Sequence, residues 1–194
     1  MLTLNEKKVL KYLIVNFNLD KSINEVAKDC RLSPNGAYKI LQKLKKEGIL
    51  YQKDIANIKS FKVSCSSPKA KRIIELAFMD KIENRLEHRY KDLLPLQKVA
   101  QIGIAFGSYI TDKKNPQDLD IVIVINKSRF TDYKKVLHKV QEIVPVKIHD
   151  VLQTKQDLIN NLHQDNKVIK QALQQGVVLW GHDILIEVFS NVCQ

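Results

Sequence analysis

The C-terminal half of the chain alternates between short runs of aliphatic residues and longer segments with helical periodicity. Two runs rich in Ile and Val, at residues 102–106 and 121–125, have the length and composition of buried strands. Further strands are expected at 146–152 and 176–181, and helices at 130–144, 154–161 and 168–174. This alternation of strands and helices predicts an α/β (α+β) architecture.

The first third of the chain carries three signals for the start of a helix. Thr3–Glu6 and Ser22–Glu25 have capping-box spacing, in which each of two side chains accepts a hydrogen bond from the other residue's backbone N–H. Ser33 is a good cap, and Pro34 after it is well tolerated at the first helical position. We expect helices that begin at these signals and end near Asn16, Cys30 and Gly48.

A β-hairpin is expected directly after these helices. Residues 49–53 and 59–63 alternate between apolar and polar side chains, and a polar break at 54–57 separates them. Three short helices followed by a hairpin make residues 2–64 similar to the winged helix-turn-helix family of prokaryotic transcription regulators. In that family the third helix enters the major groove of DNA, and the hairpin, called the wing, touches the backbone or the minor groove.

The winged helix-turn-helix resemblance implies a set of contacts with double-stranded DNA. Asn35, Tyr38 and Lys39, near the start of the third helix, would face base edges. Five lysines would hold phosphates, namely Lys43 and Lys46 on the helix and Lys53, Lys59 and Lys62 on the wing. The alternatives are a lysine-rich face that is merely solvated and a winged helix that contacts protein.

The charge of the chain is unevenly distributed. The net charge is +11, yet residues 99–194 hold 11 Lys and Arg against 10 Asp and Glu. Residues 1–66 hold 13 against 6. A positive field concentrated on the N-terminal third indicates a polyanionic partner there.

Residues 67–97 are predicted to form one long connecting helix. Ile74, Phe78, Ile82 and Leu86 recur at four-residue spacing, and the pattern continues until Pro95, which we expect to end it. Such a helix either spaces two domains or pairs with its counterpart in a homodimer. Winged-helix regulators commonly dimerise, which favours the homodimer weakly.

Length and composition fit a protein of two small domains. The sequence has 194 residues, and we expect a DNA-binding domain at 1–66, the connecting helix at 67–97 and a second domain at 98–194. No apolar run approaches the roughly 20 residues of a membrane span, so no membrane partner is expected. Three widely spaced cysteines favour a reduced, cytoplasmic protein without structural zinc.

The chemistry of the second domain is expected around residues 102–125. Gly107 and Ser108 follow the first aliphatic run, and Asp118 and Asp120 open the second. Because side chains alternate along a strand, the two carboxylates fall on one face, where they can share divalent cations. Gly107 permits close backbone approach to a ligand, and Ser108 offers a hydroxyl and an N–H. A phosphate-holding turn beside two metal-binding carboxylates suits phosphoryl or nucleotidyl transfer.

This pattern of strand, Gly-Ser, spacer, Asp-x-Asp and apolar strand resembles the signature of the DNA polymerase beta-like nucleotidyltransferase superfamily. Its small stand-alone members, the minimal nucleotidyltransferases, are the most similar, and the resemblance covers about residues 98–190. It implies a mixed sheet flanked by helices, magnesium held by Asp118 and Asp120, and an NTP substrate, most plausibly ATP, bound at Gly107 and Ser108. Relatives transfer NMP to proteins (often toxin partners), to small molecules or to RNA ends.

The sequence departs from the family pattern in three places. Active members carry a third carboxylate on the strand after the intervening helix; here Asp150 is out of step, and His149 is the alternative metal ligand or base. A register shift or bulge is one way for Asp150 to reach the pair. The spacer is one residue short, and a common glycine is replaced by Asp112, with Lys113 and Lys114 available to offset its charge.

Two functions are therefore compatible with the sequence. The first is a DNA-binding nucleotidyltransferase that transfers NMP to a protein, RNA or small-molecule hydroxyl with magnesium. The second is a DNA-binding transcription regulator whose nucleotidyltransferase-like domain is an inactive nucleotide sensor or a dimerisation module.

Overall fold

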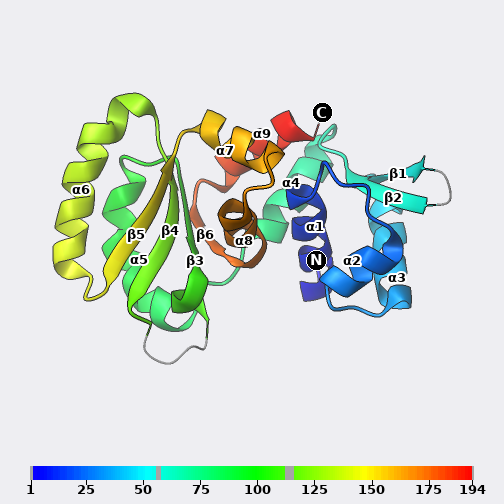
Figure 1. Ribbon diagram of the computed structural model, residues 1–194, viewed down its shortest axis with the longest axis horizontal. Coiled ribbons are helices and arrows are strands. Elements are labelled where there is room, and N and C mark those ends of the chain that lie inside the picture. Colours follow the sequence, from blue (N-terminus) through cyan, green and yellow to red (C-terminus); the bar gives the residue numbers. More distant parts are fainter. Residues whose placement is uncertain (1, 56–57, 112–115, 194) are drawn as a thin grey trace. The chain divides into compact units, whose positions relative to one another are not determined.

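The computed structural model describes residues 2–55, 58–111 and 116–193 (Figure 1). The chain divides into two compact units, one formed by Met1–Phe78 with Phe189–Gln194 and the other by Met79–Val188. Within the described ranges, no helix has both the length and the apolar composition needed to cross a bilayer.

The first unit contains four helices and a hairpin: α1 Leu4–Val15, α2 Ile23–Asp29, α3 Pro34–Lys46, β1 Leu50–Ile55, β2 Ile58–Val63 and α4 Pro68–Phe78. Both predicted capping boxes are confirmed, with Thr3 and Ser22 as the N-caps of α1 and α2. Ser33 caps α3 through its hydrogen bond from the Gly36 N–H, and Gly48 follows α3 with a φ of 75°. The helix starts were thus readable from local sequence.

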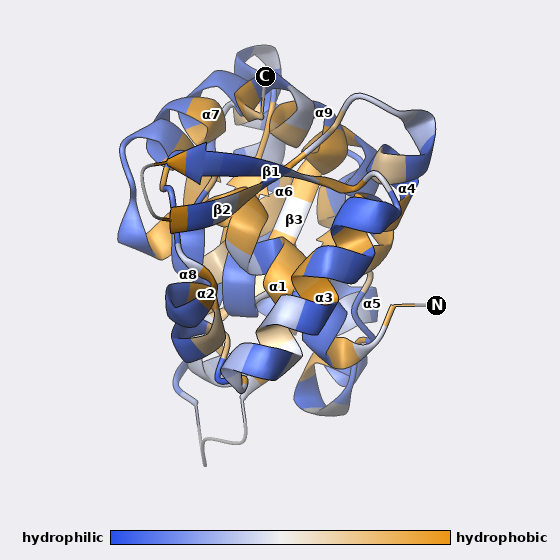
Figure 2. Cartoon of the chain, turned by 90° about the vertical axis from the view of Figure 1, so that its right-hand side faces the viewer, coloured by the Kyte–Doolittle hydropathy of each residue, from blue (hydrophilic) through white to orange (hydrophobic). Residues whose placement is uncertain are grey.

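The core of this unit is built from the second half of α1, where every residue from Val9 to Val15 is buried, from one face of α3 and from the inner face of the hairpin. α3 carries both hydrophilic and hydrophobic residues in Figure 2, and its buried members are Ala37, Leu41 and Leu44. β1 and β2 are antiparallel, with Leu50 opposite Val63, and both of these side chains are buried. The amphipathic face of α3 leaves its polar side exposed to solvent.

The second unit is a mixed four-stranded sheet in the order β5-β4-β3-β6. β3 is antiparallel to both β4 and β6, whereas β4 and β5 are parallel. Its elements are α5 Asn84–Gln97, β3 Ile102–Phe106, the 3-10 turn η1 Gly107–Ile110, β4 Asp118–Val124, the 3-10 turn η2 Lys127–Arg129, α6 Phe130–Ile143, β5 Lys147–Gln153, α7 Lys155–His163, α8 Lys167–Gln175, β6 Val177–Trp180 and α9 His182–Val192. The α/β fold with a mixed sheet flanked by helices is confirmed.

The helices of the second unit cover the sheet on two sides. Figure 1 shows α5 and α6 on one side and α7 and α8 on the other. β3 is buried at every position and β4 at every position from Leu119 onward except Asp120. Strands covered on both faces lose the polar–apolar alternation of half-exposed strands, which explains the continuous Ile and Val runs.

The prediction of one long connecting helix over 67–97 is wrong. α4 ends at Phe78 and α5 begins at Asn84, with non-helical residues between them. Ile74 and Phe78 are buried in the first unit, whereas Leu86 belongs to the core of the second. The four-residue spacing is therefore continuous across two helices that serve separate cores.

Pro95 does not end the connecting segment as predicted. It lies inside the last turn of α5, which continues to Gln97. A proline removes one backbone N–H from the helical ladder, and near a helix C-terminus that loss affects only the final turn. The last part of α9 also joins the first unit, which the predicted boundary at residue 98 did not anticipate.

Candidate functional site

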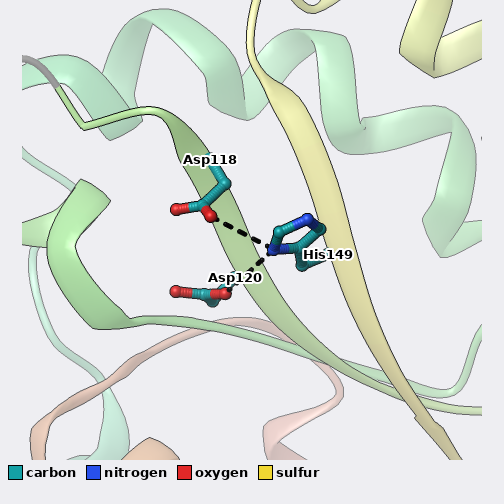
Figure 3. Close-up of side chains that lie close together, drawn as sticks. All are labelled: Asp118, Asp120 and His149. Carbon is teal, nitrogen blue, oxygen red and sulfur yellow. Dashed lines mark ion pairs between the residues drawn. The ribbon is translucent and has the colours of Figure 1, made fainter.

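The regular geometry of the sheet brings three polar side chains together at one end of β4 and β5. Asp118 and Asp120 are two residues apart on β4, and His149 on β5 is the Cα partner of Asp120. His149 Nδ1 lies 3.2 Å from Asp118 Oδ2 and 3.8 Å from Asp120 Oδ1, as Figure 3 shows. One donor atom from each side chain lies within 4.8 Å of the others. We call these three residues the Asp118–Asp120–His149 cluster.

The pairing of β4 with β5 runs without a register shift, so Asp150 faces away from this cluster. Its carboxylate instead accepts a hydrogen bond from the Tyr133 hydroxyl at 2.9 Å and lies 3.3 Å from Lys134 Nζ. Of the two predicted alternatives for the third group, the structure brings His149 to the carboxylate pair and does not bring Asp150. The proposed bulge is absent from the described β4–β5 pairing.

Two side chains of α6 hold β5 in this register. Tyr133 is fully buried, and burial together with the adjacent Asp150 carboxylate raises the pKa of its hydroxyl. Gln141 accepts from the Ile148 N–H at 2.7 Å and donates to the Val146 carbonyl at 2.9 Å. Neither contact is predictable from the sequence, because a tyrosine on an apolar helix face and a glutamine at its edge carry no signal of their partners.

Gly107 and Ser108 stand where β3 ends, next to the carboxylates. Phe106 is the Cα partner of Asp120, and Gly107 follows with a φ of 76°. A Cβ at position 107 would overlap Asp120 Oδ2, so glycine is required both by the backbone conformation and by the neighbouring carboxylate. The half-buried Ser108 is the second residue of η1, and its carbonyl accepts from the Thr111 hydroxyl at 2.9 Å. The predicted departures at Asp112, Lys113 and Lys114 lie outside the described residues.

The electrostatics of the cluster favour a cation. Partial burial raises the pKa of Asp120, the nearby charge of Asp118 raises it further, and His149 opposes both effects. Two carboxylates in a half-buried position repel each other, and a divalent ion between them removes that repulsion. Carboxylate oxygen and imidazole nitrogen are both ligands for divalent metals in proteins, so the donor set fits such an ion.

A mixed sheet that presents a glycine-serine turn beside two strand carboxylates agrees with the arrangement expected from the nucleotidyltransferase resemblance. The comparisons agree: residues 73–184 match the model of the family described as Polymerase beta, Nucleotidyltransferase, and the chain belongs to that family. No curated protein and no solved structure matches the chain significantly.

The first unit exposes several of the predicted DNA-contacting residues on one surface. Asn35, Tyr38 and Lys39 are exposed on the first half of α3, and Lys59 is exposed on β2. A shallow groove runs between the starts of α2 and α3 and the hairpin, lined by Ser22, Asn24, Asn35, Tyr38, Ile58 and Lys59. Lys46 is exposed in the last turn of α3.

Three of the predicted phosphate-binding lysines have carboxylate partners within the unit. Lys43 Nζ lies 2.7 Å from Glu6 Oε1, and Lys53 Nζ lies 3.3 Å from Asp20 Oδ2. Both lysines remain about half exposed. An exposed ammonium of this kind can still reach a phosphate, at the cost of exchanging one partner for another.

Lys62 differs from these two, and its predicted phosphate contact does not agree with its position. Its ammonium donates to the carbonyls of Phe17 and Leu19 at 2.9 and 2.7 Å, and lies 2.9 Å from Asp20 Oδ1. Its side chain is only 12% exposed. An ammonium has three donors, so these three acceptors use its capacity and make Lys62 a structural residue that ties β2 to residues 17–20.

Proposed function

We propose that the protein is a DNA-binding nucleotidyltransferase that transfers NMP from an NTP, with ATP as the preferred donor, to the hydroxyl of a protein, RNA or small molecule. The observation that carries the proposal is the placement of the Asp118–Asp120–His149 cluster directly beside the Gly107–Ser108 turn. Family membership supports nucleotidyl transfer in general.

The reaction forms a bond between the acceptor oxygen and the α-phosphorus and breaks the bond to the β-phosphate oxygen, which leaves as pyrophosphate. Asp118 and Asp120 would hold the divalent metal, which would neutralise charge on the phosphates. The N–H groups and hydroxyl at Gly107 and Ser108 orient the outer phosphates, because donors fixed before the reaction need no reorganisation. The acceptor proton goes to a carboxylate oxygen of the cluster that does not bind the metal, because Asp150 faces away from the cluster and accepts a hydrogen bond from Tyr133.

The enzymatic half of the proposal is tested with ATP labelled at the α-phosphate and Mg²⁺ or Mn²⁺. Labelled product on the protein itself, on RNA or on small-molecule hydroxyls is expected, and Asp118→Asn should abolish it. Asp132→Asn is the matched control, since it removes a carboxylate that is half exposed on α6 and pairs only locally with Arg129. Absence of transfer, combined with nucleotide binding that does not depend on Asp118, would falsify the proposal.

The DNA-binding half rests on the first unit. The excess of Lys and Arg over residues 1–66 and the exposed Asn35, Tyr38, Lys39 and Lys59 support binding to double-stranded DNA. A gel-shift titration of a duplex over increasing salt should show affinity that falls steeply, because each phosphate contact releases counterions. If the protein fails to retard any duplex at low salt, DNA binding is removed from the proposed function.

A second candidate is favoured by the lack of a third carboxylate in the cluster. His149 occupies the position next to Asp120, and Asp150 is engaged by Tyr133 and Lys134. A domain that binds nucleotide and metal without turnover would act as a nucleotide sensor or dimerisation module of a transcription regulator. The two candidates differ in one measurement: a sensor binds ATP and returns it unchanged, whereas the enzyme releases pyrophosphate.

A further inference from the structure

The donor set of the cluster is unusual because it is mixed. β5 contributes only one potential ligand to this end of the sheet, His149, whose strand neighbours on the same face are Lys147 and Val151. Among the described residues that could hold a metal, the group of three therefore contains two carboxylates and one imidazole. The nitrogen donor comes from a rigid strand rather than from a loop.

The distances suit direct coordination by the imidazole. His149 Nδ1 lies 3.2 Å from Asp118 Oδ2 and 3.8 Å from Asp120 Oδ1. Two donors on one ion with bonds of about 2.1 Å lie about 3.0 Å apart in octahedral geometry and about 3.4 Å apart in tetrahedral geometry. The two nitrogen–oxygen distances thus come within about 1 Å of those expected for donors on one ion. One donor atom from each of the three side chains lies within 4.8 Å of the others.

Imidazole nitrogen changes which ion the cluster prefers. Mg²⁺ is a hard ion that takes oxygen ligands and gives up water reluctantly, whereas Co²⁺, Ni²⁺ and Zn²⁺ accept nitrogen readily. Two carboxylates and a neutral imidazole also carry one negative charge fewer than three carboxylates do. Both differences weaken the binding of Mg²⁺ to the cluster relative to the binding of transition-metal dications.

We infer that His149 is a direct metal ligand and that it shifts the selectivity of the site from Mg²⁺ towards a nitrogen-accepting transition-metal dication. This inference deepens the proposed function and rests on it for its catalytic meaning. It concerns the identity of the ion at the cluster and is measurable without nucleotide or turnover.

The experiment compares metal binding by the wild-type protein and two variants. Calorimetric titration with Co²⁺ and with Mg²⁺ gives the ratio of the two affinities for each protein. His149→Asp supplies a third carboxylate, and we expect it to lower the Co²⁺-to-Mg²⁺ affinity ratio by about 10-fold or more, partly through tighter Mg²⁺ binding. His149→Gln should lose Co²⁺ affinity without gaining Mg²⁺ affinity.

A spectroscopic readout separates coordination from a general structural effect. The visible absorption of bound Co²⁺ depends on its ligands, so it should change in both His149 variants. His138→Asn is the matched control: His138 is exposed on α6 beside Glu142, and its loss should leave the affinity ratio and the spectrum unaltered. An unchanged affinity ratio in His149→Asp, in a protein that melts cooperatively like the wild type, overturns the inference.

Failure of the inference and failure of the proposed function give different results. Transfer of NMP with Mg²⁺, together with an unchanged affinity ratio in His149→Asp, leaves the proposed function standing and removes the inference. Co²⁺ binding that depends on His149, without nucleotidyl transfer under any of these metals, leaves the inference standing and removes the proposed enzymatic function.

Discussion

Asp120 and His149 are opposite each other on parallel neighbouring strands, with Asp120 Oδ1 3.8 Å from His149 Nδ1. Both side chains project from regular strands of one sheet, and Asp118 joins them from the same face of β4. Ligands fixed by strand geometry are held more precisely than ligands on loops. Strand geometry therefore holds the three side chains of the cluster close together.

The close approach of Gly107 to Asp120 makes position 107 sensitive to a single methyl group. Gly107→Ala forces alanine into a left-handed conformation, which costs about 1–3 kcal/mol, and displaces the Asp120 carboxylate. We expect lower stability in urea and at least a 10-fold loss of metal affinity.

Gly48→Ala is the control for that experiment, because Gly48 has a similar φ of 75° with no atom near its absent Cβ. It should reproduce the loss of stability and keep the metal affinity of the wild type. Equal metal binding by Gly107→Ala and Gly48→Ala would show that Asp120 does not depend on the glycine.

Asp150 should be dispensable for metal binding and for transfer. Its carboxylate is held by Tyr133 and Lys134 on the far face of β5, so Asp150→Asn is expected to bind metal as the wild type does and to retain most of its transfer rate. Asp118→Asn, assayed in parallel by calorimetry and by label transfer, should lose both. A large loss of metal affinity in Asp150→Asn would mean that the carboxylate reaches the cluster after all.

Glu6 and Lys43 should make the first unit sensitive to acid. Burial alone would raise the pKa of Glu6, but its hydrogen bonds with Lys43 and Thr3 hold that pKa below its ordinary value of about 4.5. A carboxylate whose pKa is lowered by folding stabilises the protein above about pH 4.5 and loses that contribution as the pH falls.

Lys43→Met should therefore lower the free energy of unfolding at pH 7 and lower it less at pH 3, measured by urea unfolding at both values. Lys46→Met, which removes an exposed lysine three residues further along α3, should change stability little at either pH. If Lys43→Met lowered the free energy of unfolding equally at both pH values, its effect would not depend on the charge of Glu6.

Lys59 and Lys62 lie three residues apart on β2, and their substitutions should affect different properties: DNA affinity for Lys59 and stability for Lys62. Lys59→Met is expected to weaken duplex binding and to reduce the slope of log affinity against log salt by about 0.9, with normal stability. Lys62→Met leaves the carbonyls of Phe17 and Leu19 without their donor, so it should lower the unfolding free energy by about 1–3 kcal/mol. Gel shift and urea unfolding of both variants check the contrast.

Local chemistry explains what sequence alone predicted correctly. The caps at Thr3 and Ser22 depend on residues three positions apart, and the shared face of Asp118 and Asp120 follows from the two-residue period of a strand. These features require no knowledge of distant contacts, and the structure confirms them.

Long-range contacts explain what sequence alone missed. The choice between His149 and Asp150 depends on the β4–β5 register, which Tyr133 and Gln141 of α6 help to fix. The role of Lys62 depends on carbonyls more than 40 residues away in the chain. A helical spacing that continues from Phe78 to Leu86 likewise gave no sign that it serves two separate cores.

The contacts of Gln141 have a consequence beyond the candidate site. β5 is an outermost strand of its sheet, and such a strand offers free backbone groups to any extended chain that meets it. The Gln141 side-chain amide already occupies the Ile148 N–H and the Val146 carbonyl, like the first rung of an additional strand. One glutamine thereby satisfies two backbone groups at the start of this edge, so an extended chain that approached there would find two fewer groups with which to pair.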